Sequence, residues 1–228
     1  MDKNIRLTVI LSLLFVALVF VLTYFRITRN NTVSLSPEVL REVGALVYEA
    51  PVVLQPFSLV DHRGQAFTQE QLKGHWSLIF FGFTSCPDIC PLTLTELSQF
   101  YRQLKTESGG ADRPQVIMVS VDPARDSTEK MAEYMNSFHE DFVGLSGPYD
   151  DVAALARQLF VSHEPPPVVA AADDHHVGHA MPAAQDYLID HSGNILIINP
   201  EGNYHGFLDA AIQDPEISLA FESIRADY

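Results

Sequence analysis

The chain has 228 residues, 47% of them hydrophobic and 19% charged, with a net charge of −15 and only two cysteines. Four of its 14 basic residues and one of its 29 acidic residues lie at positions 1–29, which leaves a net charge of −18 for the rest. This acidity argues against a nucleic-acid partner, because a phosphate backbone requires a basic surface. Two cysteines are too few for a structural disulfide framework.

An uncharged apolar segment extends from Leu7 to Phe25, with two basic residues on each side of it. Its 19 residues are enough to span a bilayer as a helix. No small-residue cleavage site follows the segment, so we expect a single retained transmembrane helix at residues 1–29 instead of a cleaved signal peptide. The balanced basic residues do not determine the orientation of this anchor.

A tether is expected at residues 30–50, followed by one domain at residues 51–228, which is long enough to bury a core. Ser36 and Pro37 are typical of a helix start and predict a short helix in the tether. The apolar stripe of this helix is expected to consist of Val39, Leu40, Val43 and Val47.

The first half of the domain predicts two kinds of strand. Phe57–Val60 and Gln65–Phe67 flank a turn that contains glycine and predict a hairpin. Thr68–Gln71 then has the pattern of a capping box at the start of a helical turn. Ser77–Phe83 is an unbroken apolar run, which is typical of a strand buried on both faces.

Strands and helices alternate along the second half. In order, we expect a helix from Pro91, a strand at Gln115–Val121, a helix capped by Asp126 and Ser127, a strand at Phe142–Leu145 and a helix at Val152–Leu159. A late hairpin of Tyr187–Ile189 and Ile195–Ile198 and a final helix from Asp214 complete the domain. This order predicts an α/β, thioredoxin-like fold, in which helices flank a central mixed sheet.

The two cysteines, Cys86 and Cys90, follow the first buried strand and stand four residues apart. On a helix such positions share one face with their Cβ atoms about 5–6 Å apart, whereas a relaxed disulfide has a Cβ separation of about 3.8 Å. The pair is therefore better spaced to bind a metal ion than to form a disulfide, although redox chemistry remains open. Thiolates favour Cu(I) or Zn, and imidazole suits both metals. We expect the helix N-terminus to lower the pKa of these thiols.

The segment Phe80–Pro91, which contains both cysteines, resembles the signature of the SCO/SenC family. Ser120–Ser127 and Phe138–Gly147 are also similar to the family, and the resemblance extends over residues 51–228. Its members are membrane-anchored copper proteins that are needed to assemble cytochrome c oxidase. Within Ser120–Ser127 we expect Asp122 and Asp126 to organise the turn near the site, since carboxylates are poor ligands for Cu(I).

The resemblance implies a copper site formed by Cys86, Cys90 and a histidine. In the family this histidine lies in an Asp-His-Ser segment, followed by an apolar strand and a turn with proline and glycine. Asp190–Gly202 has this pattern, so the third ligand is expected to be His191. The oxidation state of the copper, Cu(I) or Cu(II), is left open.

A rival register would select His179 as the ligand, if Tyr187–Asp190 were the strand that follows it. We favour His191 because its register also places the late turn and the final helix sensibly. The long loop Asp173–Met181 contains His176, His179 and Met181, which are candidates for an auxiliary copper-capture site. A disordered insertion with incidental histidines is the simpler interpretation of this loop.

The family resemblance implies a copper metallochaperone that loads the binuclear copper site of cytochrome c oxidase subunit II. A copper donor protein and a thiol reductant would be further partners. The alternative is a thiol-disulfide oxidoreductase that uses Cys86 and Cys90 to reduce cysteines of the same target, so enzyme activity is undecided. A peroxidase would need its peroxidatic thiol in a different context. The resemblance further implies a single-pass protein with its domain in the periplasm or in the mitochondrial intermembrane space. The short N-terminal segment lacks an Arg-rich transit peptide, so we expect the bacterial inner membrane with the domain in the periplasm.

Overall fold

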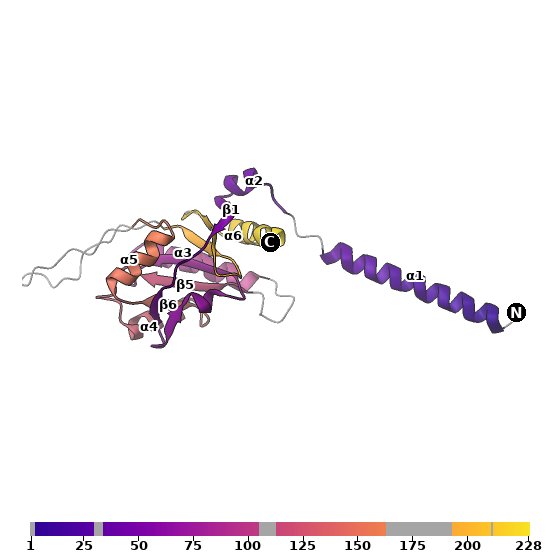
Figure 1. Ribbon diagram of the computed structural model, residues 1–228, viewed down its shortest axis with the longest axis horizontal. Helices are drawn as coiled ribbons and strands as arrows, with labels where there is room; N and C mark the ends of the chain where they lie inside the picture. The colour runs from indigo at the N-terminus through magenta and orange to yellow at the C-terminus, as the bar shows by residue number, and fades with distance from the viewer. Residues whose placement is uncertain (1–2, 30–33, 105–112, 163–192, 211) are drawn as a thin grey trace, which may run out of the picture. The chain divides into compact units, whose positions relative to one another are not determined.

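The computed structural model describes residues 3–29, 34–104, 113–162, 193–210 and 212–228 (Figure 1). The chain divides into two compact units, one of residues 1–35 with 221–228 and one of residues 36–220. The expected boundaries at residues 29 and 50 stay predictions.

The smaller unit contains the long helix α1 (Lys3–Arg29), whose side chains are described from Ile10 to Tyr24. In the part of the chain that the structure describes, no helix is both long and apolar enough to cross a membrane. The anchor expected at Leu7–Phe25 is therefore not confirmed.

A mixed sheet of eight strands, counted over the described residues, forms the centre of the larger unit. The strands lie in the order β1-β8-β7-β4-β5-β6-β2-β3. Their bounds are β1 (Ala45–Val52), β2 (Ser58–Asp61), β3 (Ala66–Thr68), β4 (Ser77–Gly82), β5 (Gln115–Ser120), β6 (Val143–Ser146), β7 (Ile195–Ile198) and β8 (Tyr204–Leu208). β4, β5 and β6 are parallel neighbours, and the remaining pairs are antiparallel. The expected α/β fold with a central mixed sheet is confirmed.

Three of the described helical segments begin at a residue whose side chain caps them. The bounds are α2 (Pro37–Glu42), the 3-10 helix η1 (Gln69–Leu72), α3 (Ile89–Gln103), α4 (Thr128–Phe138), α5 (Tyr149–Gln158) and α6 (Glu216–Asp227). Ser36 and Ser127 each accept a hydrogen bond from a backbone N–H in the first turn of their helix, and Thr68 forms the expected capping box. These side chains satisfy N–H groups that have no partner within the helix.

Helices cover both faces of the sheet (Figure 1). On one face, Val152 and Leu155 of α5 belong to the same buried cluster as Phe81 and Val119. On the other face, α3 and α4 are joined, because Ser98 Oγ of α3 donates a hydrogen bond to the carbonyl oxygen of residue 138. All six residues of β4 are buried, as its unbroken apolar sequence predicted.

One side of the sheet, formed by β1 and β8, differs from the expectation. β1 and β8 were not predicted, and Val47 lies in β1 instead of on the helix before it. The helix ends at Glu42 because Gly44 adopts a φ of 82°, which turns the chain away from the helical path.

β7 pairs with β8 and with β4, whereas Tyr187–Ile189 lies outside the described residues, so the predicted hairpin around His191 is untested.

Candidate metal centre

Both cysteines lie just beyond the carboxyl end of β4, where the chain turns into α3. The backbone N–H of Cys86 donates to the carbonyl oxygen of Phe83 at 3.1 Å, and Cys90 is in the first turn of α3. Both are free thiols in the structure. Cys86 is partly exposed, whereas Cys90 is only 1% exposed. Cys86 is thus the more exposed of the two residues, although it packs against the hydrophobic core, and Cys90 is enclosed by protein.

Gly82, the last residue of β4, lets the Cys90 sulfur pack against the sheet. A Cβ atom at position 82 would lie 2.9 Å from Cys90 Sγ and 3.1 Å from a ring carbon of Phe80. A carbon and a sulfur cannot approach this closely without displacement of one of them. The absence of a side chain at position 82 therefore sets the position of the Cys90 sulfur.

Burial raises the pKa of the Cys90 thiol far above its ordinary range. A hydrogen bond with the Cys86 side chain and the charges of Cys86 and Asp126 act in the same direction, and only a backbone hydrogen bond with Phe83 opposes them. For Cys90 the expected lowering of the pKa at the helix N-terminus is wrong, because desolvation of the thiolate outweighs it. A metal ion that binds Cys90 must therefore displace a proton.

A buried carboxylate, Asp126, holds the cysteine turn against the neighbouring strand. Its oxygens accept hydrogen bonds from Thr84 N at 3.1 Å, Thr84 Oγ1 at 2.5 Å and Ser120 Oγ at 2.6 Å. Lys130 Nζ lies 3.8 Å from the same carboxylate and donates to Ser85 Oγ at 3.1 Å. The turn before Cys86 is thereby joined to β5 and α4. The expected organising role of Asp126 is consistent with these contacts, whereas its expected capping of α4 falls to Ser127.

Asp122 forms a second buried contact behind the turn. Its backbone N–H donates to Ser120 Oγ at 3.1 Å, and its carboxylate accepts a hydrogen bond from Arg125. The Arg125 guanidinium also lies 5.6 Å from the centre of the Phe83 ring. This pair of charges neutralises a carboxylate that would otherwise be costly to bury.

Tyr134 of α4 also belongs to the surroundings of the cysteines. It follows Lys130 by one turn of the helix, and its hydroxyl is buried without a hydrogen-bond partner among the described residues. Burial raises its pKa, and the charges of Cys90, Cys86 and Asp126 raise it further. The hydroxyl therefore stays protonated at neutral pH and is a hydrogen-bond donor near the thiols. The sequence places Tyr134 one helical turn after Lys130, but this spacing indicates a position near the cysteines only when the contact between Lys130 and the cysteine turn is known.

His191, the expected third ligand, lies outside the described residues, as do His179 and Asp173–Met181. The chain is described again from Gly193, where an added Cβ would lie 3.3 Å from Ile89 Cγ1. Ile89 stands between the two cysteines in the sequence. The start of the segment after His191 is thus packed against the cysteine turn. Within the described ranges, no group of three or more His, Cys, Asp or Glu side chains could hold a metal ion.

Comparison with known proteins links this arrangement to one family. The family model for SCO1/SenC matches residues 47–224. A protein of Stutzerimonas stutzeri is 32% identical over 184 residues, which cover 78% of this chain and 82% of that one. The mitochondrial protein SCO2 of Saccharomyces cerevisiae is 36% identical over 170 residues, which cover 75% of this chain and 51% of that one. The chain thus matches about half the length of this mitochondrial relative.

Solved structures agree with the sequence comparison. The crystal structure of yeast Sco1 with copper bound is similar to this chain with a TM-score of 0.64 and 32% identity. The match covers 77% of this chain and 90% of the yeast chain. A homologue with the same fold therefore binds copper.

Proposed function

The chain belongs to the SCO1/SenC family, and on this premise we propose that it is a membrane-anchored copper metallochaperone. Cys86, Cys90 and His191 hold the copper ion, which the protein delivers to the binuclear copper site of cytochrome c oxidase subunit II. The observation that carries this proposal is the pair of free thiols at the turn from β4 to α3. Thiolates are soft ligands and suit Cu(I).

The unequal exposure of the two sulfurs gives them different roles in transfer. Cys90 is buried and protonated, so copper binding releases its proton to solvent and leaves a desolvated thiolate as the inner ligand. Cys86 is partly exposed, so a thiolate of the recipient can reach the copper from this side. Ligand exchange therefore begins at Cys86, and Cys90 releases the ion last.

The choice of His191 is supported by the packing of the residues that follow it. Gly193 lies against Ile89, so the chain leaves position 191 only two residues before it contacts the cysteine turn. Two residues span at most about 7 Å. The shorter separation from Gly193 supports His191 over His179, which is 14 residues from Gly193.

Membrane attachment is part of the same proposal. The uncharged segment Leu7–Phe25 is the anchor, and the domain faces the periplasm from the inner membrane. Alkaline carbonate extraction of membranes should leave the protein in the pellet, and protease added to spheroplasts should digest the domain. Release by carbonate, or protection of the domain until the cells are lysed, would contradict this placement.

A thiol-disulfide oxidoreductase is the second candidate, and one contact favours it. The Cys86 side chain is close enough to Cys90 to raise its pKa through a hydrogen bond. The dithiol could pass two electrons and two protons to a disulfide of the recipient and become a disulfide itself. A reductant such as a donor dithiol would then restore the pair.

An anaerobic copper titration of the full chain separates the two functions. We expect one equivalent of Cu(I) in the reduced parent, loss of tight binding in Cys90→Ser and much weaker binding in His191→Ala. His75→Ala is the matched control, because His75 interacts with Gln115 on another part of the sheet. If His191→Ala bound copper as the parent does, His179 would be favoured as the third ligand. A parent that binds no copper but reduces a disulfide of the recipient would favour the oxidoreductase.

A further inference from the structure

An apolar pocket opens directly beside the cysteine turn. It has a volume of about 200 Å³ and is formed by one face of α3, the start of β7 and the loop after β8. Its lining includes Ile89, Leu92, Glu96, Ile195, Ile212 and Gln213. Ile89, Leu92 and Glu96 stand at positions i, i+3 and i+7 of α3 and so lie on one face of the helix. Nothing in the proposed copper chemistry uses this pocket.

Two residues connect the pocket with the metal centre and with solvent. Ile89 lies between the two cysteines in the sequence and also contacts Gly193, at the end of the segment that contains His191. Leu92, one helical turn further, is 47% exposed. Leu92 thus adds an exposed apolar side chain to the edge of the apolar pocket.

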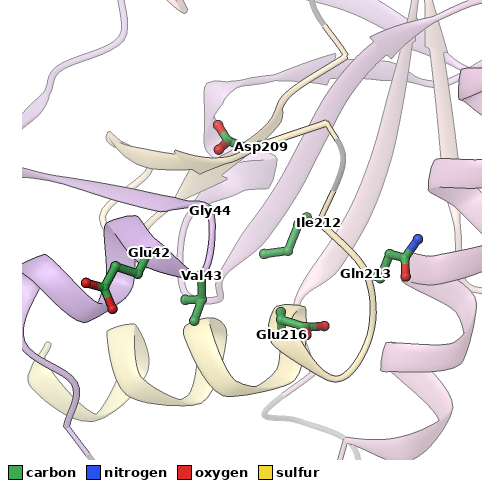
Figure 2. Close-up of a pocket in the computed structure, with 7 residues that line it drawn as sticks. All are labelled: Glu42, Val43, Gly44, Asp209, Ile212, Gln213 and Glu216. Atoms are coloured by element: carbon green, nitrogen blue, oxygen red, sulfur yellow. The ribbon is translucent and has the colours of Figure 1, made fainter.

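A second pocket lies on the other side of Ile212 and Gln213, which line both (Figure 2). Its volume is about 300 Å³, and Glu42, Asp209 and Glu216 contribute carboxylates to its lining. Figure 2 shows the Ile212 side chain directed into this hollow, with Val43 and Glu216 around it. Among the described residues, no lysine, arginine or histidine lines either pocket.

We propose that these two adjoining pockets form the docking surface for the protein that receives the copper. The apolar pocket takes an apolar side chain of the recipient, and the acidic pocket takes a lysine or arginine close to it. The inference rests on the proposed function and adds the site that selects the recipient. Apolar anchors at the centre of an interface with complementary charges beside them are the usual source of affinity and specificity.

The charge of the chain decides between a recipient and a second copy of the same protein. The net charge is −15, so two copies that met through their acidic pockets would place carboxylates against carboxylates. A basic partner is instead attracted from a distance and oriented by the same field. A recipient that docked at Leu92 would have its own thiols held near Cys86. Copper exchange would then be a step within one complex.

The test uses the full chain loaded with Cu(I) and, as the probe, the soluble copper-site domain of subunit II from the same organism. Leu92→Ser removes the exposed apolar contact, and Glu42→Gln with Glu216→Gln neutralises two of the three acids. The matched controls are Val60→Ser, on β2 with 38% exposure, and Asp150→Asn with Asp151→Asn on α5. β4, β5 and β6 separate β2 from β7 in the sheet.

We expect Leu92→Ser to raise the Kd for the probe about tenfold and to slow copper transfer equally. The acid variant should lower the association rate severalfold at low salt and lose this difference at high salt. Both variants should still bind one equivalent of copper with parent-like melting temperatures, and both controls should behave as the parent does.

Different results overturn the docking surface and the proposed function. Parent-like binding and transfer in both pocket variants, with copper binding intact, would overturn the docking surface and leave the metallochaperone in place. A second outcome would also overturn the docking surface for the recipient: the parent is a dimer, Leu92→Ser dissociates it, and copper transfer does not change. The occupant of the pockets would then be a second copy of the chain. A parent that holds no copper would instead overturn the proposed function.

Discussion

At the scale of single residues, the metal centre depends on groups that leave very little free space. Gly82 admits the Cys90 sulfur, and burial of that sulfur keeps it protonated. Tyr134 adds a protonated hydroxyl nearby. Small changes at these positions should therefore alter copper binding before they alter the fold.

Gly82→Ala should weaken copper binding about tenfold and lower the free energy of unfolding by about 1–3 kcal/mol, because its Cβ would displace the Cys90 sulfur. Gly147→Ala is a suitable control, since its Cβ would press on Leu59 Cδ2 at 2.8 Å, away from the cysteines. That control should lose stability without a loss of copper affinity. Copper titration and urea unfolding measure the two effects, and equal copper affinity in both variants would contradict the role given to Gly82.

His62 should make the stability of the domain depend on pH. Its Nδ1 accepts a hydrogen bond from Gly144 N at 3.0 Å, which requires an unprotonated nitrogen. Burial lowers the pKa of His62, and the charge of Arg63 lowers it further. The folded state therefore binds a proton less readily than the unfolded state, in which the histidine pKa is about 6.5.

The stability that neutral His62 contributes is fully present above about pH 6.5 and declines as the pH falls from there through the lower folded pKa. Urea unfolding of the parent and of His62→Gln at pH 7.5 and 5.5 tests this sign. The parent should lose more stability between these pH values than the variant does. An equal loss of stability in the parent and the variant would show that His62 does not cause the pH dependence.

At the scale of elements, polar contacts join the cysteine turn to its neighbours. Asp126 connects the turn after β4 with β5 through Thr84 and Ser120, and Lys130 connects it with α4. The parallel strands β4 and β5 end next to each other, so the turns that follow them lie together at the carboxyl ends of the strands. Open α/β sheets commonly have their binding sites at the carboxyl ends of the strands.

Asp126→Asn should lower the free energy of unfolding by about 2 kcal/mol, because an amide NH₂ cannot accept the hydrogen bonds that one carboxylate oxygen now accepts. The loosened turn should also release copper faster to a chelator. Asp141→Asn is the control, since Asp141 is exposed and its carboxylate contacts Tyr101 instead of the turn. A slower release from Asp126→Asn than from the parent would contradict the clamping role.

At the scale of the whole molecule, copper should act as a stabilising ligand. A ligand that binds only the folded state adds about 4.1 kcal/mol at a free concentration of 1,000 times its Kd. The melting temperature of the reduced full chain should therefore rise with Cu(I) and return to its starting value after chelation. Because binding displaces the Cys90 proton, the rise should be larger at pH 8 than at pH 6. Cys90→Ser should show no such rise. A melting temperature of the parent that did not change with Cu(I) would contradict the proposed site.

The sequence by itself determined the elements with strong local signals and the candidate chemistry. β4 and β5 are continuous apolar runs, and Ser36, Thr68 and Ser127 mark helical starts through contacts with residues two or three positions away. The pairing of Cys86 and Cys90 and the family resemblance are equally local. Interactions of this range can be inferred from spacing alone.

Only the tertiary structure decided the features that depend on distant partners. β1 and β8 pair residues about 160 positions apart, such as Ala45 with Leu208, and neither segment has a strong strand pattern. The raised pKa of Cys90 comes from burial, which the helix position did not predict. The apolar pocket beside the turn combines α3, β7 and the loop after β8. Desolvation and pocket shape arise when remote segments pack together, so no local pattern in the sequence encodes them.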